Sequence, residues 1–178
     1  MGIRDRELDR LKKYAQGLGI KVTIRPAKKG EGGAEWDMDV REITLYKSSS
    51  STKTDLILAF LHELGHHLDW IYKNKKDNKE CFKAYELLNE GSMYGNRTDI
   101  PQKYRDIILQ EEIDGVYYMD IIYKELDLKI PLWKVKLAQH MDLIEYKSLS
   151  KTGNFLTHKY VKNYRKKIKN KYMKKYKG

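Results

Sequence analysis

An apolar helix that carries two histidines one turn apart constrains the fold of this chain more than any other feature. Hydrophobic residues recur at three- and four-residue spacing and predict a helix from Asp55 to about Lys73. His62 and His66 fall on a different stripe of this helix, where they can face a neighbouring element. The expected core face comprises Ile57, Leu61, Leu64, Leu68 and Ile71.

His62, Glu63 and His66 form the pattern His-Glu-x-x-His, which is typical of zinc-dependent hydrolases. Residues four apart in a helix lie about 40° apart in projection, so both imidazoles can point at one ion. Glu63 lies about 100° round from His62, where its carboxylate can accept a proton from water activated by the metal. The pattern predicts His62 and His66 as zinc ligands and Glu63 as the general base.

Gly65 lies between the two histidines, inside the predicted helix. Glycine in a helix interior costs about 1 kcal/mol relative to alanine, so a second reason for its presence is needed. Its position predicts that another element of the chain packs closely against this helix.

A catalytic zinc site normally has three protein ligands and a water molecule, so one protein ligand remains to be found. A third histidine on the same helix is excluded, because Asp69 and Tyr72 occupy the positions where that longer motif has glycine and histidine. The single cysteine, Cys81, follows the motif, which excludes the deformylases with their upstream cysteine ligand. A carboxylate on a later helix remains, and Glu111 and Glu112 lie in the middle of one. Adjacent helical residues point about 100° apart, so only one of these two can reach the ion.

The rest of the sequence predicts an α+β fold that is mostly helical. Alternating apolar residues predict strands near 20–25, 36–40 and 41–47, and a change of phase at Val40–Glu42 indicates a hairpin. We expect these strands to form a three-stranded antiparallel sheet. Further helices are expected over residues 4–17, 79–89, 101–126 and 131–147.

The run from Arg41 to Trp70 resembles the ImmA/IrrE metallopeptidases, a family of small zincins of the gluzincin type, and the resemblance extends over residues 20–126 at most. In that family the third ligand opens a Glu-x-x-Ala pattern, followed by an aromatic residue three positions later. The best register on this sequence puts Glu112 at the ligand, Gly115 at the small residue in place of alanine and Tyr118 at the aromatic residue, which implies Glu112 as the third zinc ligand. Glu111 is the main alternative. The remaining candidates are Glu86, Glu90, Asp69 and His140.

The resemblance also implies a zinc-dependent intracellular endopeptidase of narrow specificity, with a protein substrate such as a transcriptional regulator. The strand Arg41–Lys47 would then lie at the edge of the cleft and bind an extended peptide by strand addition. The candidates for stabilising the oxyanion are His140, Tyr94, Tyr117 and Tyr118. The rival interpretation is a nucleic-acid or host-protein binding factor on a zincin scaffold, with a structural or lost metal.

Two residues beside the motif have supporting roles in this prediction. His67 lies off the ligand stripe, so we expect it behind the ligands or at the surface. Asp69 shares the face of His66 one turn on, where its carboxylate could orient a ligand histidine by a hydrogen bond.

The positive charge of the chain is concentrated at its C-terminal end. The net charge is +11, no acidic residue follows Glu145, and 12 lysines and arginines lie between Lys147 and Lys177. Residues 1–146 contain 24 basic and 25 acidic residues and are close to neutral. We therefore predict a zincin-like metallopeptidase domain over residues 1–147 and a basic helical arm over residues 148–178.

The arm has an apolar stripe among its basic residues, and three interpretations of it stay open. In the first, the arm binds nucleic acid through the segment Lys159–Lys177. In the second, it binds a membrane or another acidic partner, and in the third, its stripe docks on the domain. No apolar run approaches the ~18 residues of a membrane span, and no signal peptide is recognised, so we expect a cytoplasmic protein. The stripe comprises Tyr160, Tyr164, Ile168, Tyr172 and Tyr176.

Overall fold

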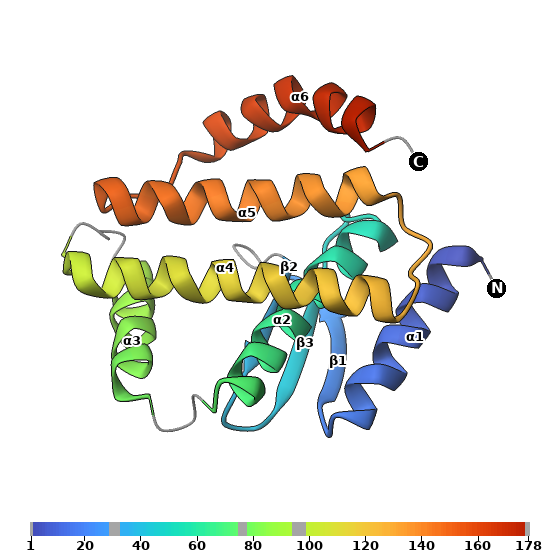
Figure 1. Cartoon of the computed structure of the whole chain (residues 1–178), viewed down its shortest axis with the longest axis horizontal. Helices are drawn as coiled ribbons and strands as arrows, with labels where there is room; N and C mark the ends of the chain where they lie inside the picture. Colours follow the sequence, from blue (N-terminus) through green and yellow to red (C-terminus); the bar gives the residue numbers. More distant parts are fainter. Residues whose placement is uncertain (1, 29–32, 75–77, 94–98, 177–178) are drawn as a thin grey trace. The chain divides into compact units, whose positions relative to one another are not determined.

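The computed structural model describes residues 2–28, 33–74, 78–93 and 99–176, apart from the side chains of residues 91–93. The chain divides into two compact units. Figure 1 shows the helices and strands, coloured along the sequence. The first unit comprises Met1–Tyr72 and Asp114–Ile130, and the second comprises Lys73–Ile113 and Pro131–Gly178. The elements are α1 (Ile3–Gly17), β1 (Lys21–Pro26), β2 (Gly33–Asp37), β3 (Glu42–Lys47), α2 (Lys53–Tyr72), α3 (Lys79–Met93), α4 (Gln102–Glu125), α5 (Leu132–Thr152) and α6 (His158–Lys175).

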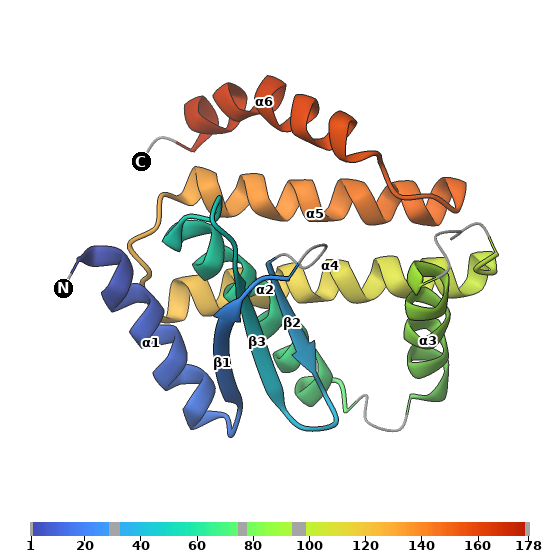
Figure 2. The ribbon, with the colours of Figure 1, turned by 180° about the vertical axis from the view of Figure 1, so that it is seen from behind.

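The fold is α+β and mostly helical, as predicted, with one small sheet in the first unit. The strand order is β1-β3-β2, and Figure 2 shows the three strands side by side with α2 behind them. The predicted hairpin is confirmed, since β2 pairs antiparallel with β3 across a turn at residues 38–41. Arg41 in this turn has a φ of 51°, in the left-handed region.

The prediction of a wholly antiparallel sheet is wrong for β1, which pairs parallel with β3. Val22 lies opposite Ile43, and Ile24 lies opposite Leu45. The alternation of apolar and polar residues that predicted β1 is the same for both strand directions, so it carries no information about pairing.

Helix α2 is the centre of the first unit. It packs against β2 and β3 on one side and against α1 on another. Leu61 and Leu64 of the predicted core face are fully buried, and Leu68 is 2% exposed. Ile71 was expected in the core but is 48% exposed, because it lies in the last turn of α2, where the helix ends at Tyr72.

The second unit is a helical assembly of α3, α5, α6 and the first half of α4. Its core comprises Ala84, Ile108 and Leu149, one residue from each of α3, α4 and α5. Helix α5 continues to Thr152 and ends at Gly153, whose φ of 75° is the left-handed conformation common after a helix. The boundary predicted at residue 148 therefore falls inside α5.

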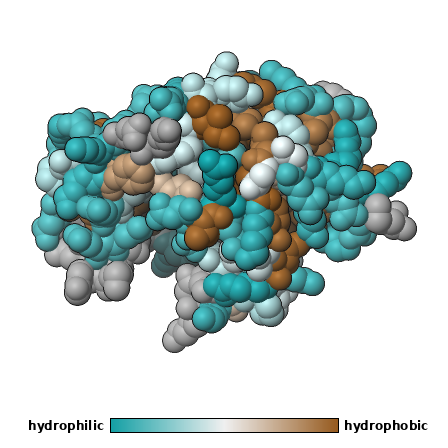
Figure 3. Space-filling view, turned by 90° about the horizontal axis from the view of Figure 1, so that it is seen from below, coloured by the Kyte–Doolittle hydropathy of each residue, from teal (hydrophilic) through white to brown (hydrophobic). Residues whose placement is uncertain are grey.

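Hydrophilic residues predominate on the face shown in Figure 3, and hydrophobic residues show between them. Among the residues that the structure describes, no helix has the length and apolar character needed to cross a membrane.

Candidate metal centre

Two glycines let α2 and α4 touch backbone to backbone. A Cβ atom added to Gly65 would lie 2.2 Å from the carbonyl oxygen of Gly115 and 3.1 Å from the backbone nitrogen of Met119. A Cβ atom on Gly115 would lie 2.8 Å from ring atoms of His66. The prediction that another element packs against Gly65 is confirmed, and that element is α4.

This contact brings a carboxylate of α4 to the histidines of α2. Glu112 lies three residues before Gly115 in the same uninterrupted helix. One ligand atom from each of His62, His66 and Glu112 lies within 4.8 Å of the other two. His62, His66 and Glu112 are therefore positioned to hold one metal ion, although His66 and Glu112 lie 46 positions apart in the sequence.

The spacing of the two imidazoles fits a shared ion. Their Nε2 atoms are 3.0 Å apart, and the rings meet edge to face. Two nitrogens bound to zinc at 2.0–2.1 Å with a tetrahedral angle would be about 3.3 Å apart. Two imidazoles and a carboxylate are also a donor set typical of catalytic zinc.

Burial makes a positive charge at this place favourable. The side chain of Glu112 is 3% exposed, and an ionised carboxylate is costly to bury unless charge or hydrogen bonds compensate it. A divalent cation bound by Glu112 would supply that compensation. Glu63, the predicted general base, follows His62 in α2 and is half-buried.

Tyr85 of α3 was not anticipated as a neighbour of these carboxylates. Burial, together with the charges of Glu112 and Glu111, raises the pKa of its phenol well above the usual value. The hydroxyl is protonated at neutral pH, as in any tyrosine with a pKa of about 10 or above. With 14 tyrosines in the chain, the sequence contains no signal that singles out this one.

A second group of carboxylates lies on the same two helices. Asp69, Glu111 and Asp114 each offer an oxygen within 4.8 Å of the others. Glu111 thus belongs to a different group from Glu112, as their 100° separation around the helix predicts. Asp114 was not singled out from the sequence, although its three-residue spacing from Glu111 places both on one face of α4.

The other candidate ligands lie elsewhere in the described chain. Glu86 is exposed and forms an ion pair with Lys83 at 3.2 Å. Glu90 is exposed. His140 lies between α5 and α6, where its Nε2 atom is 3.2 Å from the hydroxyl of Tyr164.

The oxyanion candidates are not brought together. Tyr118 stacks on Tyr72 with ring centroids 5.6 Å apart, whereas Tyr117 is 63% exposed. His140 lies between α5 and α6, as described above, and Tyr94 lies outside the described residues.

His67 was expected either behind the ligands or at the surface. It is buried, so the surface position is wrong. It is 2% exposed, and its ring meets Trp36 edge to face at 5.5 Å. Burial, and secondarily the charge of Arg41, lowers its pKa to about 4, so the ring is neutral at pH 7. Neither ring nitrogen has a hydrogen-bond partner among the described residues.

No protein-family description, curated protein or solved structure matches this chain. The resemblance to the ImmA/IrrE metallopeptidases stays a prediction.

Proposed function

We propose that this protein is a zinc-dependent endopeptidase of narrow specificity. One observation carries the proposal: His62, His66 and Glu112 offer three ligand atoms within 4.8 Å of one another where α2 meets α4. Glu63, next to His62 in sequence, adds the carboxylate that such a hydrolase needs as a base.

The chemistry then divides between the ion and the protein. When bound, zinc supplies Lewis acidity that polarises the scissile carbonyl and makes water a better nucleophile. The Glu63 carboxylate accepts a proton from the attacking water as the water oxygen bonds to the carbonyl carbon. The carbon–nitrogen bond then breaks, and Glu63 returns the proton to the leaving nitrogen.

The place expected for the substrate needs a correction. The strand Arg41–Lys47 was expected at the cleft edge, but β3 is the middle strand and pairs on both sides, so it has no free edge. β2 is the outer strand on the side of the sheet next to α2. A Cβ atom on Gly33 of β2 would lie 3.8 Å from the Cβ atom of Ala59, which precedes His62 by three residues. In this proposal an extended peptide pairs with the outer edge of β2.

The direct test is cleavage of a diverse mixture of synthetic peptides by the purified, zinc-loaded protein, with products identified by mass spectrometry. We expect cleavage at a restricted set of sequences, loss of cleavage after removal of the metal by a chelator, and recovery after zinc is added back. Cleavage that continues after complete removal of the metal, or no cleavage by protein that holds one zinc ion per chain, would contradict the proposal.

A further inference from the structure

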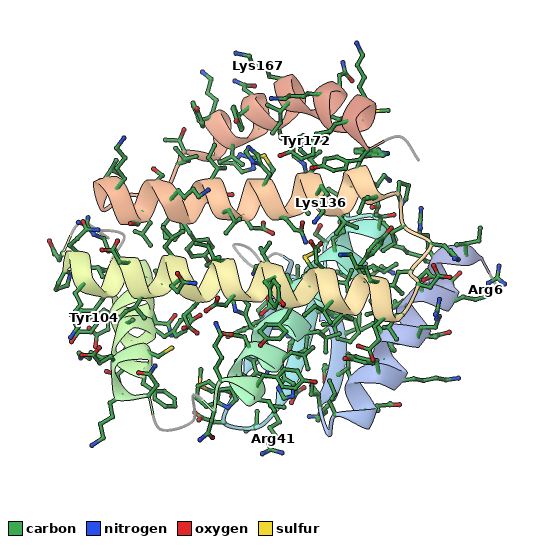
Figure 4. All side chains as sticks on the ribbon, viewed as in Figure 1. Arg6, Arg41, Tyr104, Lys136, Lys167 and Tyr172 are labelled. Atoms are coloured by element: carbon green, nitrogen blue, oxygen red, sulfur yellow. The ribbon has the colours of Figure 1, made fainter. Side chains whose placement is uncertain are left out.

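The apolar stripe of α6 packs on α5 within the second unit. Tyr164 contacts His140 as described above, and the ring centroid of Tyr172 lies 5.5 Å from that of His140. Burial, and then the charges of Lys147 and Lys171, lower the pKa of His140, which favours the neutral ring in this contact. Figure 4 shows Tyr172 on the side of α6 that faces α5 and Lys167 on the opposite side.

This packing on α5 bears on whether α6 binds a partner through its apolar stripe or through its charged side chains. An amphipathic helix binds a membrane by burying its apolar face in the lipid, and here that face contacts α5. Proteins that bind single strands stack bases on aromatic side chains, and the tyrosines of α6 turn towards α5 or stack on one another. Apart from Tyr160, which is 50% exposed, α6 presents mainly charged side chains outward.

The outward charge is dense and of one sign. Helix α6 contains nine lysines and arginines and no acidic residue, and all nine are exposed. Within the described part of the chain, no ion pair involves any of them. An 18-residue helix is about 27 Å long, a length over which a nucleic-acid duplex presents about 16 phosphate charges. Lys177, the last residue of the predicted segment, lies outside the described residues. The nine are Lys159, Lys162, Arg165, Lys166, Lys167, Lys169, Lys171, Lys174 and Lys175.

Part of this charge converges on a groove along one flank of α6. The groove has a volume of about 340 Å³. Four of its six lining residues are permanent cations, so an anion in the groove lies close to several positive charges. The lining residues are His158, Val161, Lys162, Arg165, Lys166 and Lys169.

We propose that this groove and the adjoining outer face of α6 bind the phosphate backbone of double-stranded nucleic acid without reading its sequence. Contacts to phosphates fix position but carry no sequence information, and lysine and arginine side chains suit them. The proposal does not depend on the hydrolytic function, since α6 contributes none of the three candidate ligands.

The test measures affinity of the full chain for 20-base-pair DNA and RNA duplexes of unrelated sequence, by fluorescence anisotropy, between about 50 and 200 mM salt. We expect log K to fall linearly with log salt, and equal affinity for different sequences. The triple variant Lys162→Gln, Arg165→Gln, Lys166→Gln should reduce that slope by about 3, because each lost phosphate contact removes about 0.9. Lys169 is left in place because its ammonium also lies over the ring of Trp133. Comparison of the DNA and RNA duplexes shows whether α6 binds both kinds of duplex backbone or only one of them.

A matched variant separates local from global charge. Arg6→Gln, Lys13→Gln, Lys47→Gln removes the same charge from exposed residues of the first unit and should leave the slope unchanged. The conservative pair Lys162→Arg, Lys166→Arg should also leave it unchanged, which guards against an effect of altered folding. Equal loss of slope in both triple variants would overturn the proposal. So would tighter binding of single strands than of duplexes, or binding to phosphatidylserine vesicles alone.

Discussion

Glu63→Gln is expected to bind zinc like the wild-type protein and to lose about 10²- to 10⁴-fold in the rate of peptide cleavage. Glutamine matches glutamate in size but cannot accept and return the proton that hydrolysis moves. Glu63 is not one of the three residues positioned to hold the ion, so the metal should stay. Initial rates on a cleaved peptide, together with zinc content per chain, measure both effects.

Glu86→Gln is the matched control, because Glu86 is an exposed glutamate that forms an ion pair with Lys83. It should cleave at the wild-type rate. If Glu63→Gln cleaves peptides as fast as the Glu86 variant, Glu63 is not the base and the mechanism proposed above is wrong. If a cellular phenotype survives Glu63→Gln, the binding-factor interpretation gains support.

Gly65→Ala is expected to destabilise the protein by about 3 kcal/mol and to weaken zinc binding. The new Cβ atom would lie 2.2 Å from the Gly115 carbonyl oxygen, which belongs to the backbone and cannot turn aside. Helices α2 and α4 must then move apart, and this shift separates the histidines from Glu112. The gain of about 1 kcal/mol from replacing a helical glycine offsets only part of the cost. Urea unfolding and zinc titration measure the two effects.

Gly115→Ala and Gly17→Ala keep this prediction testable even if the Gly65 variant does not fold. A Cβ atom on Gly115 meets the His66 ring at 2.8 Å, so zinc affinity should fall by about 10- to 100-fold. Gly17 lies in α1, and its added Cβ atom would meet nothing within 4 Å, so alanine there should stabilise by up to about 1 kcal/mol. A similar gain in stability for Gly65→Ala would show that the two helices do not touch at Gly65.

The sequence was most informative where local patterns decide the structure. The apolar period identified α2, and the spacing of His62 and His66 identified its candidate ligands. The cost of glycine at position 65 predicted that another element packs there. The start of α4 after Pro101 followed from the restricted backbone of proline. Each of these inferences depends on residues less than two helical turns apart.

The sequence was least informative where distant segments choose their partners. The alternation of β1 fits either strand direction, so the parallel pairing with β3 was missed, and with it the position of β3 in the middle of the sheet. Asp114 and Tyr85 approach the other carboxylates only because separate helices pack together. Ile71 fits the spacing of apolar residues in α2 but is 48% exposed. That spacing does not show where along a helix burial stops.

The assignment of Glu112 over Glu111 shows how the two kinds of information combine. Helix geometry predicted that only one of these neighbours could face the histidines. The choice between them came from a family resemblance, and the structure groups Glu112 with His62 and His66 while Glu111 lies with Asp69 and Asp114. Whether Glu112 binds the ion is a question for measurement.

The most direct test of the metal centre is zinc content per chain, measured by mass spectrometry after zinc loading and dialysis. We compare the wild-type protein with Glu112→Ala and with Glu111→Ala, its buried neighbour. The wild-type protein and Glu111→Ala should each retain one zinc ion per chain, and Glu112→Ala should lose it. Full zinc retention by Glu112→Ala, or none by the wild-type protein, would contradict the three-ligand centre on which the proposed hydrolysis depends.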